Sequence, residues 1–233
     1  MLSVLVVLLV VAVLVGDGYA RSYAERTVAE KLTGTGPFST APTVRIDGSP
    51  FLTQAVRGRY EHVTVDGSGL TLGELRDVRF HADLRGVRVP LSDVLSGSVR
   101  SVPVERAEGQ VVISYAEFAR QTGIDGLRIT EDGGKLTVTA PVRVKVLFLN
   151  ETFDVAADGT VAANGGDLAL TVSGIRVAGV SLPGFAVNYI EDYLNDRVTL
   201  PALPYGLQLQ SVTPEADGLH VAVRGTDLDI ATS

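Results

Sequence analysis

Hydrophobic and polar residues follow successive patterns along the chain, and the first is an apolar run without charge, MLSVLVVLLVVAVLV (1–15). As a helix rising about 1.5 Å per residue, this run covers about 22 Å, less than the roughly 30 Å hydrocarbon core of a bilayer. It resembles the apolar part of a signal peptide, with Gly18 and Ala20 as small residues before a cleavage point. Because no basic residue precedes the run, an uncleaved membrane anchor is the open alternative. Both alternatives predict export or envelope anchoring, with residues 1–20 separate from one domain over residues 21–233.

Good helix formers follow the apolar run and predict a helix over residues 21–32. Its apolar positions are sparse, so it is expected to be mostly solvated. A second helix is predicted over residues 115–122, because Ser114 and Glu117 form a capping box before it and Gly123 follows as a C-terminal cap.

From about Thr43 to Leu84, apolar and polar residues alternate, most clearly around residues 78–85, which is typical of strands with one solvated face. The longest alternation runs from Leu136 to Phe148, and at about 3.4 Å per residue such a strand exceeds roughly 40 Å. A strand of this length must bend, and Pro141 is expected at an edge or a bulge. Turn residues between the runs favour an antiparallel meander. They are Asp66-Gly67, Asp132-Gly133-Gly134, Asp158-Gly159, Asn164-Gly165-Gly166 and Asp217-Gly218.

Two stretches of the chain resemble each other, Ile129–Val138 and Val212–Val221. An internally duplicated β-meander would explain the likeness, although Asp-Gly hairpins also arise independently. The alternating strands offer more apolar surface than a few helices can cover. The sheet must therefore close on itself, wrap a helix or enclose an apolar ligand such as a lipid. We predict an α+β fold with a long, strongly curved antiparallel sheet and few helices. Its apolar face either packs as a dry core of Val and Leu or lines an elongated apolar groove, and the pattern alone leaves both open.

Composition narrows the classes of function. The net charge is −7, which argues against a nucleic-acid partner, and the absence of Cys removes thiolate chemistry and Cys-ligated zinc. The three His residues lack metal-ligand spacing, and no G-x-S-x-G motif accompanies the Ser residues. The sequence therefore predicts neither an enzyme nor a bound metal or cofactor.

Several motifs together carry a family resemblance. Residues 47–54 (DGSPFLTQ) and 58–65 (GRYEHVTV), continued by residues 86–95 and 109–118, resemble the signature of the LmeA-like phospholipid-binding family of exported actinobacterial proteins. The likeness spans nearly the whole chain. It implies a phospholipid-binding protein of the cell envelope or periplasm that supports the synthesis or maintenance of envelope glycolipids. It also implies a fold similar to the tubular lipid-binding (BPI-like) superfamily, and it brings no catalytic residues.

The expected lipid contacts are apolar side chains of the Pro50-Phe51-Leu52 turn, of a short helix after Pro90, of the long strand and of an amphipathic helix predicted over residues 184–198. They are Phe51, Leu52, Leu91, Val94, Leu95, Val144, Val146, Phe148, Phe185, Tyr189 and Tyr193. Ordinary core packing is the alternative for each of them.

Four arginines are candidates for the lipid headgroup, because a guanidinium group binds phosphate through paired hydrogen bonds. They are Arg57, Arg59, Arg85 and Arg88, and a solvated strand face is the plainer interpretation. The sequence thus predicts an exported or anchored protein that carries or presents acyl lipid. Its partners would be phospholipid, the membrane surface and envelope biosynthesis proteins. An anchored β-rich scaffold or interaction module with a dry core is the alternative.

Overall fold

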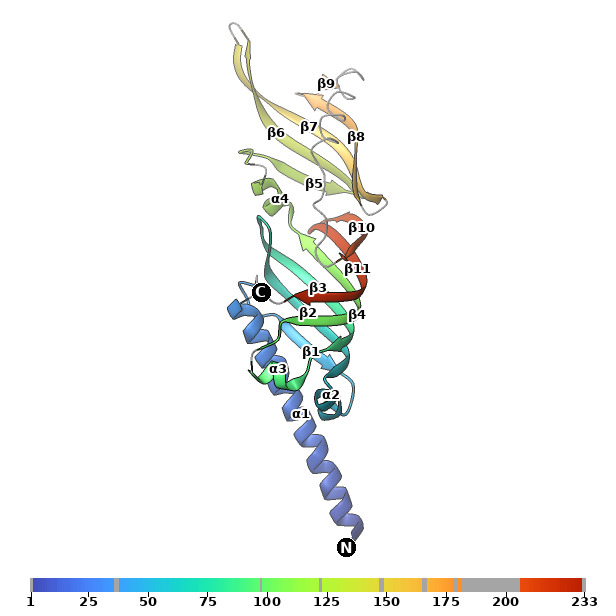
Figure 1. Cartoon of the computed structure of the whole chain (residues 1–233). Helices are drawn as coiled ribbons and strands as arrows, with labels where there is room; N and C mark the ends of the chain where they lie inside the picture. The colour runs from blue at the N-terminus through green and yellow to red at the C-terminus, as the bar shows by residue number, and fades with distance from the viewer. Residues whose placement is uncertain are drawn as a thin grey trace.

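The protein is described by a computed structural model, in which two antiparallel sheets follow one another along an elongated molecule (Figure 1). A helix projects from the end of the first sheet that lies away from the second sheet. The structure describes residues 2–35, 38–96, 98–121, 123–146, 149–164, 167–177, 180–181 and 206–231, and within these ranges the side chains of residues 91, 95 and 142–153, among others, are not described.

The projecting helix α1 (Leu2–Thr35) is continuous through Gly16–Ala20, where the sequence had predicted a separation between the apolar run and a second helix. Its first half leads away from the sheets, and its second half lies along the first sheet (Figure 1). Residues 21–32 are therefore less solvated than expected. One face of this half packs on the core through Ala20, Ala24, Val28, Ala29 and Leu32.

No helix in the searched, described part of the chain combines the length and the hydropathy that crossing a membrane requires.

The first sheet, sheet A, has six antiparallel strands in the order β1-β2-β3-β4-β11-β10. They are β1 (Thr43–Asp47), β2 (Arg59–Leu72), β3 (Leu75–Arg88), β4 (Ser101–Ile113), β10 (Gln208–Glu215) and β11 (Gly218–Ala231). The predicted alternation is confirmed, because Val78 is buried and Phe80, Ala82 and Leu84 pack on the core while the charged residues between them lie on the other face. The core therefore lies between this apolar face and α1.

The second sheet, sheet B, has five strands in the order β5-β6-β7-β8-β9. They are β5 (Arg128–Asp132), β6 (Lys135–Val146), β7 (Leu149–Asn164), β8 (Asp167–Val177) and β9 (Val180–Ser181). Pro141 of β6 lies beyond Thr139, the last residue of β6 that pairs with β5. It therefore occupies a locally open edge, as predicted, while it stays in register with Asp154 of β7.

Three short helices complete the described part of the chain: α2 (Phe51–Arg57), α3 (Leu91–Ser96) and α4 (Tyr115–Gln121). The predicted cap of α4 is confirmed, because the Glu117 N–H donates to Ser114 Oγ at 3.2 Å and Gly123 has a φ of 66°. The structure places Phe51 and Leu52 in the first turn of α2 rather than in a loop. The helix predicted over residues 184–198 lies outside the described residues.

Two of the predicted turns are wrong. Asp66-Gly67 lies within β2 and Asp158-Gly159 lies within β7, and at each place the strand shifts register against its neighbour. These glycines serve close packing in a bulge, since a Cβ on Gly159 would lie 2.8 Å from the Thr171 carbonyl oxygen. The turn between β2 and β3 is instead at Gly73-Glu74.

The predicted class, α+β with mostly antiparallel strands and few helices, is confirmed. The strands form two sheets instead of one, because α4 intervenes between β4 and β5, and neither sheet closes into a barrel. The two stretches that resemble each other form the β5–β6 and β10–β11 hairpins, one at an edge of each sheet. The duplication itself stays a prediction.

Candidate functional site

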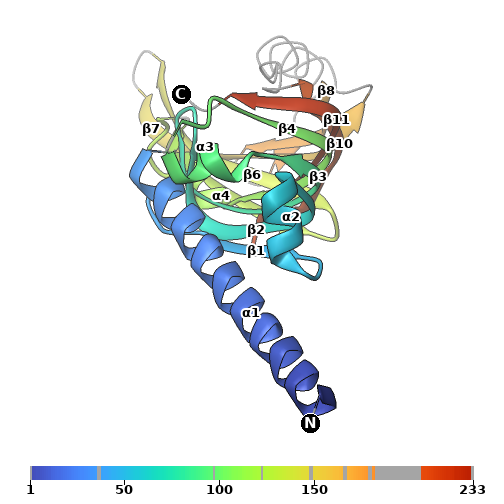
Figure 2. The ribbon, with the colours of Figure 1, turned by 60° about the horizontal axis from the view of Figure 1, so that its bottom comes forward.

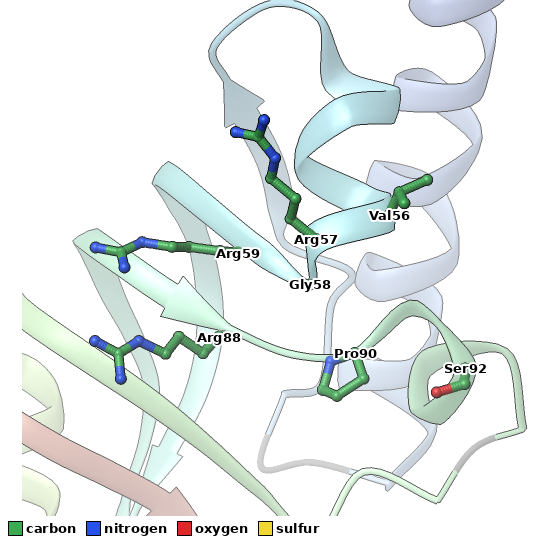
Figure 3. A pocket seen from close by; sticks show the side chains of 7 residues that line it. All are labelled: Val56, Arg57, Gly58, Arg59, Arg88, Pro90 and Ser92. Carbon is green, nitrogen blue, oxygen red and sulfur yellow. The ribbon is translucent and has the colours of Figure 1, made fainter.

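An open hollow of about 660 Å³ lies where α2, β2, β3 and α3 meet at the end of sheet A. Three of its lining residues are arginines that the sequence had singled out, and Figure 3 shows their side chains around it. Its volume falls within the range of small-molecule sites, but its arginines suit a charged group better than an acyl chain. The lining residues are Val56, Arg57, Gly58, Arg59, Arg88, Pro90 and Ser92.

Two of these arginines face each other across neighbouring strands. Arg59 of β2 is paired in register with Arg88 of β3, which brings two like charges together. Glu105 of β4 relieves the repulsion, because its Oε1 accepts hydrogen bonds from Arg59 at 2.9 Å and from Arg88 at 2.5 Å. The hydrogen bond from Arg88, with the charges of Arg59 and Arg88, holds the pKa of Glu105 below its usual value. One carboxylate thus bridges two guanidinium groups.

Gly86 makes room for this bridge. It has a φ of 64°, and a Cβ at this position would lie 2.3 Å from Glu105 Oε2 and 2.7 Å from Glu105 Cγ. The Glu105 side chain can lie across β3 because no side chain stands in its way. A residue of segment 86–95, which carried part of the family resemblance, therefore shapes the charge of the hollow without lining it.

We expect Gly86→Ala to destabilise the protein by more than Gly73→Ala. Both glycines have a positive φ, which costs an L-residue about 1–2 kcal/mol, but a Cβ on Gly73 meets nothing within 4 Å. The difference between the two variants in urea unfolding measures the contact with Glu105. Equal losses would show that Glu105 moves aside at no cost.

The third arginine differs from the other two. Arg57 ends α2 and is exposed, and within the described part of the chain it has no ion-pair partner. Three arginines and no acid are among the described residues that line the hollow, and Glu105 pairs with only two of them, so the hollow carries a net positive charge. Arg85 is not part of it, because its Nε lies 3.4 Å from the Asp83 carboxylate on the same strand.

Helix α2 is positioned by the segment that carried the family resemblance. Gln54 is buried and connects its neighbours, since Nε2 donates to the Asp47 carbonyl at 3.0 Å and Oε1 accepts from the Glu61 N–H at 2.9 Å. Phe51 is only 3% exposed and packs on Tyr60, with their ring centroids 6.2 Å apart. These contacts fix the start of β2, and with it Arg59, relative to α2.

The N-terminus of α2 is capped from another helix. Its N-cap residue is Pro50, which makes no side-chain capping bond, so the first amides of the helix need another acceptor. Asp17 of α1 supplies it, accepting from the Phe51 N–H at 2.9 Å and from the Leu52 N–H at 2.8 Å. The hydrogen bonds from Leu52 and Phe51 hold the pKa of Asp17 below its usual value. Arg21, one turn later, donates to the Gly48 carbonyl at 2.6 Å.

The structure separates the expected lipid contacts into core and surface. Phe51 belongs to the core of sheet A, and Val94 of α3 is half-buried against the same core. Leu52 is 43% exposed on the outer side of α2. Leu91 and Leu95 lie in α3, and Val144 and Val146 in β6, but their side chains are outside the described set. Phe148, Phe185, Tyr189 and Tyr193 lie outside the described residues, so the apolar groove stays a prediction.

His62 and His81 lie on the solvated faces of their strands. His62 lies between Asp47 Oδ2 at 2.8 Å and Asp83 Oδ2 at 2.6 Å. Partial burial favours the neutral form of Asp83, but hydrogen bonds and charges from His62 and Arg85 outweigh it and lower its pKa. His81 pairs with Asp66 at 2.6 Å.

The β10–β11 hairpin gathers Glu215, Asp217 and His220 within 4.8 Å of one another, a grouping that could hold a cation. Asp217 already has two hydrogen-bond partners: His220 of the same group at 2.8 Å and Arg79 of β3 at 2.6 Å. Their hydrogen bonds lower the pKa of Asp217 to about 2. Arg79 and His220 therefore balance the negative charge of Asp217, which a cation would otherwise do.

Sequence reasoning missed three residues that shape this region: Asp17, Gly86 and Glu105. Asp17 is the only charged side chain among the first twenty residues, and such an isolated charge indicates a specific bonding partner. The role of Glu105 depends on strand register, which no local pattern reveals.

A comparison with curated proteins gave no match. A family profile described as LmeA-like phospholipid-binding matches residues 12–224, which include α2, the arginine hollow and most of both sheets. Because the match covers most of the sequence, the chain belongs to the LmeA-like phospholipid-binding family.

Proposed function

We propose that this protein carries or presents phospholipid in the cell envelope and that the arginine hollow receives the lipid headgroup. The observation that carries the proposal is that Arg57, Arg59 and Arg88 line one open hollow, and that Glu105, the only acid paired with any of them in the described part of the chain, bonds just two of the three. Guanidinium groups bind phosphate oxygens through paired, charge-assisted hydrogen bonds. The family to which the chain belongs supports a phospholipid as the source of that phosphate.

Glu105 sets how the hollow responds to an anion. While it bridges Arg59 and Arg88, it keeps both guanidinium groups in place, as their distances of 2.9 and 2.5 Å indicate. A phosphate entering the hollow would compete with the carboxylate for the outer N–H groups. Arg57 has no such competitor within the described part of the chain, so it makes the first contact.

The acyl chains would lie in an elongated apolar groove of the tubular lipid-binding type. Its lining would come from the sequence-assigned residues that the structure does not place in the core or on α2: Leu91, Leu95, Val144, Val146, Phe148, Phe185, Tyr189 and Tyr193. Burial of each CH₂ group stabilises the complex by about 0.8 kcal/mol, so the chains supply most of the affinity. Few polar contacts are then obligatory, and several headgroups would be tolerated. Envelope glycolipid synthesis or maintenance is the process that such a carrier would serve, with envelope biosynthesis proteins as its partners.

We further propose that the protein acts by binding and not as an enzyme. His62 and His81 support this, because their contacts are with aspartates on solvated strand faces. We propose an exported or membrane-anchored location on the basis of the uncharged run of residues 1–15.

Native mass spectrometry on the full chain, followed by lipid extraction, tests the proposed function. We expect a stoichiometric phospholipid adduct in the wild type. The double variant Arg59→Gln/Arg88→Gln should carry at least about fivefold less anionic phospholipid, since each arginine near a lipid surface contributes about 1 kcal/mol.

Arg176→Gln is the matched control, because Arg176 also bonds an acid, Asp158, but lies in sheet B. Its adduct should equal that of the wild type. A wild-type chain that stays without lipid after incubation with phospholipid vesicles would contradict the proposal and favour the scaffold with a dry core.

A further inference from the structure

We propose that the α2 end of sheet A is a docking surface for an anionic phospholipid bilayer, held against the bilayer by the hydrogen bonds between Asp17 and α2. This inference rests on the proposed function, because it supplies the membrane from which the arginine hollow would take its lipid. It also implies that residues 1–15 stay attached to the folded domain.

The first support is the direction of α1. Its uncharged N-terminal half leaves the molecule from the end that carries α2 and α3, away from sheet B (Figures 1 and 2). An apolar helix that enters a bilayer would therefore bring this end of sheet A to the headgroup region. Sheet B would point away from the membrane.

The second support is the surface of α2. Val56 is 82% exposed and Leu52 is 43% exposed, and the two residues are four positions apart, so they lie on one side of the helix. Arg57 follows directly at the C-terminus of α2. Exposed aliphatic side chains beside a cation suit the boundary between anionic headgroups and acyl chains.

The third support comes from α1 just after its apolar run. Tyr19 is 79% exposed and Tyr23 is 63% exposed, and their four-residue spacing places both on one face of α1. Tyrosine is enriched at membrane–water interfaces, because its ring is apolar and its hydroxyl is polar. These two rings follow Val15, where the uncharged run ends, and would lie at headgroup depth.

The contact between Asp17 and α2 converts these separate features into one surface. Two hydrogen bonds from α2 to Asp17, at 2.9 and 2.8 Å, and the Arg21–Gly48 bond fix the position of α2 relative to the projecting helix. Insertion of α1 therefore determines the orientation of Leu52, Val56 and the hollow. A protein partner would not require the apolar helix and this surface to point the same way.

Site-directed spin labelling tests the docking directly, because the chain has no native Cys. Single-cysteine variants Val56→Cys and Leu52→Cys of the full chain carry a nitroxide, and Phe118→Cys on α4 is the control, with a native exposure of 43%. The variants are reconstituted into vesicles of phosphatidylcholine with one third phosphatidylglycerol. Accessibility to oxygen and to a water-soluble nickel chelate is then compared.

We expect the labels at positions 52 and 56 to favour oxygen over the nickel chelate, and the label at position 118 to favour the chelate. Adding Arg57→Gln should shift the ratio of docked to undocked molecules about fivefold toward undocked in these vesicles. Asp17→Asn should leave the chain bound to vesicles but expose the label at position 56 to the chelate. Labels at 52 and 56 that are as accessible to the chelate as the label at 118 would overturn the docking surface and favour a protein partner.

Lipid extraction from the same samples separates this inference from the proposed function. A chain that carries phospholipid while positions 52 and 56 stay in water overturns the docking surface alone. A chain that docks but carries no lipid overturns the proposed function alone.

Discussion

Replacing Phe51 with alanine will destabilise the protein by about 3–5 kcal/mol, the usual cost of removing a buried aromatic side chain. Phe51 is 3% exposed and packs on Tyr60 within the core of sheet A. The cavity left behind would lie between α2 and β2, two elements that position the arginine hollow. Urea unfolding followed by circular dichroism, with an unchanged dependence on urea, measures the loss.

Leu52→Ala is the matched control, since Leu52 is the next residue but is 43% exposed. Its effect on stability should stay within about 0.5 kcal/mol, as for most surface substitutions. This pair of variants tests which of the two residues belongs to the core. If Phe51→Ala leaves stability unchanged and Leu52→Ala lowers it, the assignment of Phe51 to the core is wrong.

A chain that begins at Arg21 will be clearly less stable than one that begins at Gly16, although the two differ by only five residues. The shorter chain lacks Asp17, so the amides of Phe51 and Leu52 lose their acceptor at the start of α2. A buried donor without a partner is costly, and Pro50 cannot replace the acceptor. Hydrogen exchange at residues 51 and 52 should accelerate by about tenfold or more.

The chain that begins at Gly16 retains the cap and serves as the control for removal of the apolar run. It should match the full chain in exchange at α2. Equal exchange in both truncated chains would show that the cap is dispensable, and cleavage after Ala20 would then be compatible with an intact fold.

Periodicity predicted β2 and β3 of sheet A because these strands have one solvated face, so that alternation in sequence corresponds to alternation in burial. The N-terminal cap of α4 was also predicted correctly, since Ser114 and Glu117 interact within one helical turn and need no distant partner. The Asp-Gly turns were predicted less well. A glycine marks either a turn or a bulge, and only pairing with a distant strand, such as β8 beside Gly159, decides between them.

The candidate site shows the same limit. Arg57, Arg59 and Arg88 were identified from their chemistry, but their position around one hollow depends on strand register and on the αL ending of α2 at Gly58. The extent of α1 was misjudged for a related reason. Gly16–Ala20 looks like a break in sequence, and the contact that stabilises helix there is with α2, more than thirty residues away.

The strand order of sheet A has a consequence for how the chain folds. Strand β11 pairs with β4, and residues 128–181 of sheet B lie between them in sequence, so this pairing closes a loop of more than one hundred residues. Sheet B is built from neighbouring strands and needs no such closure, and local contacts form faster than distant ones. During synthesis or export, β4 therefore presents an unpaired edge until the last strand emerges. This interval is when the chain is most exposed to edge-to-edge aggregation, and any chaperone that serves it should act on β4.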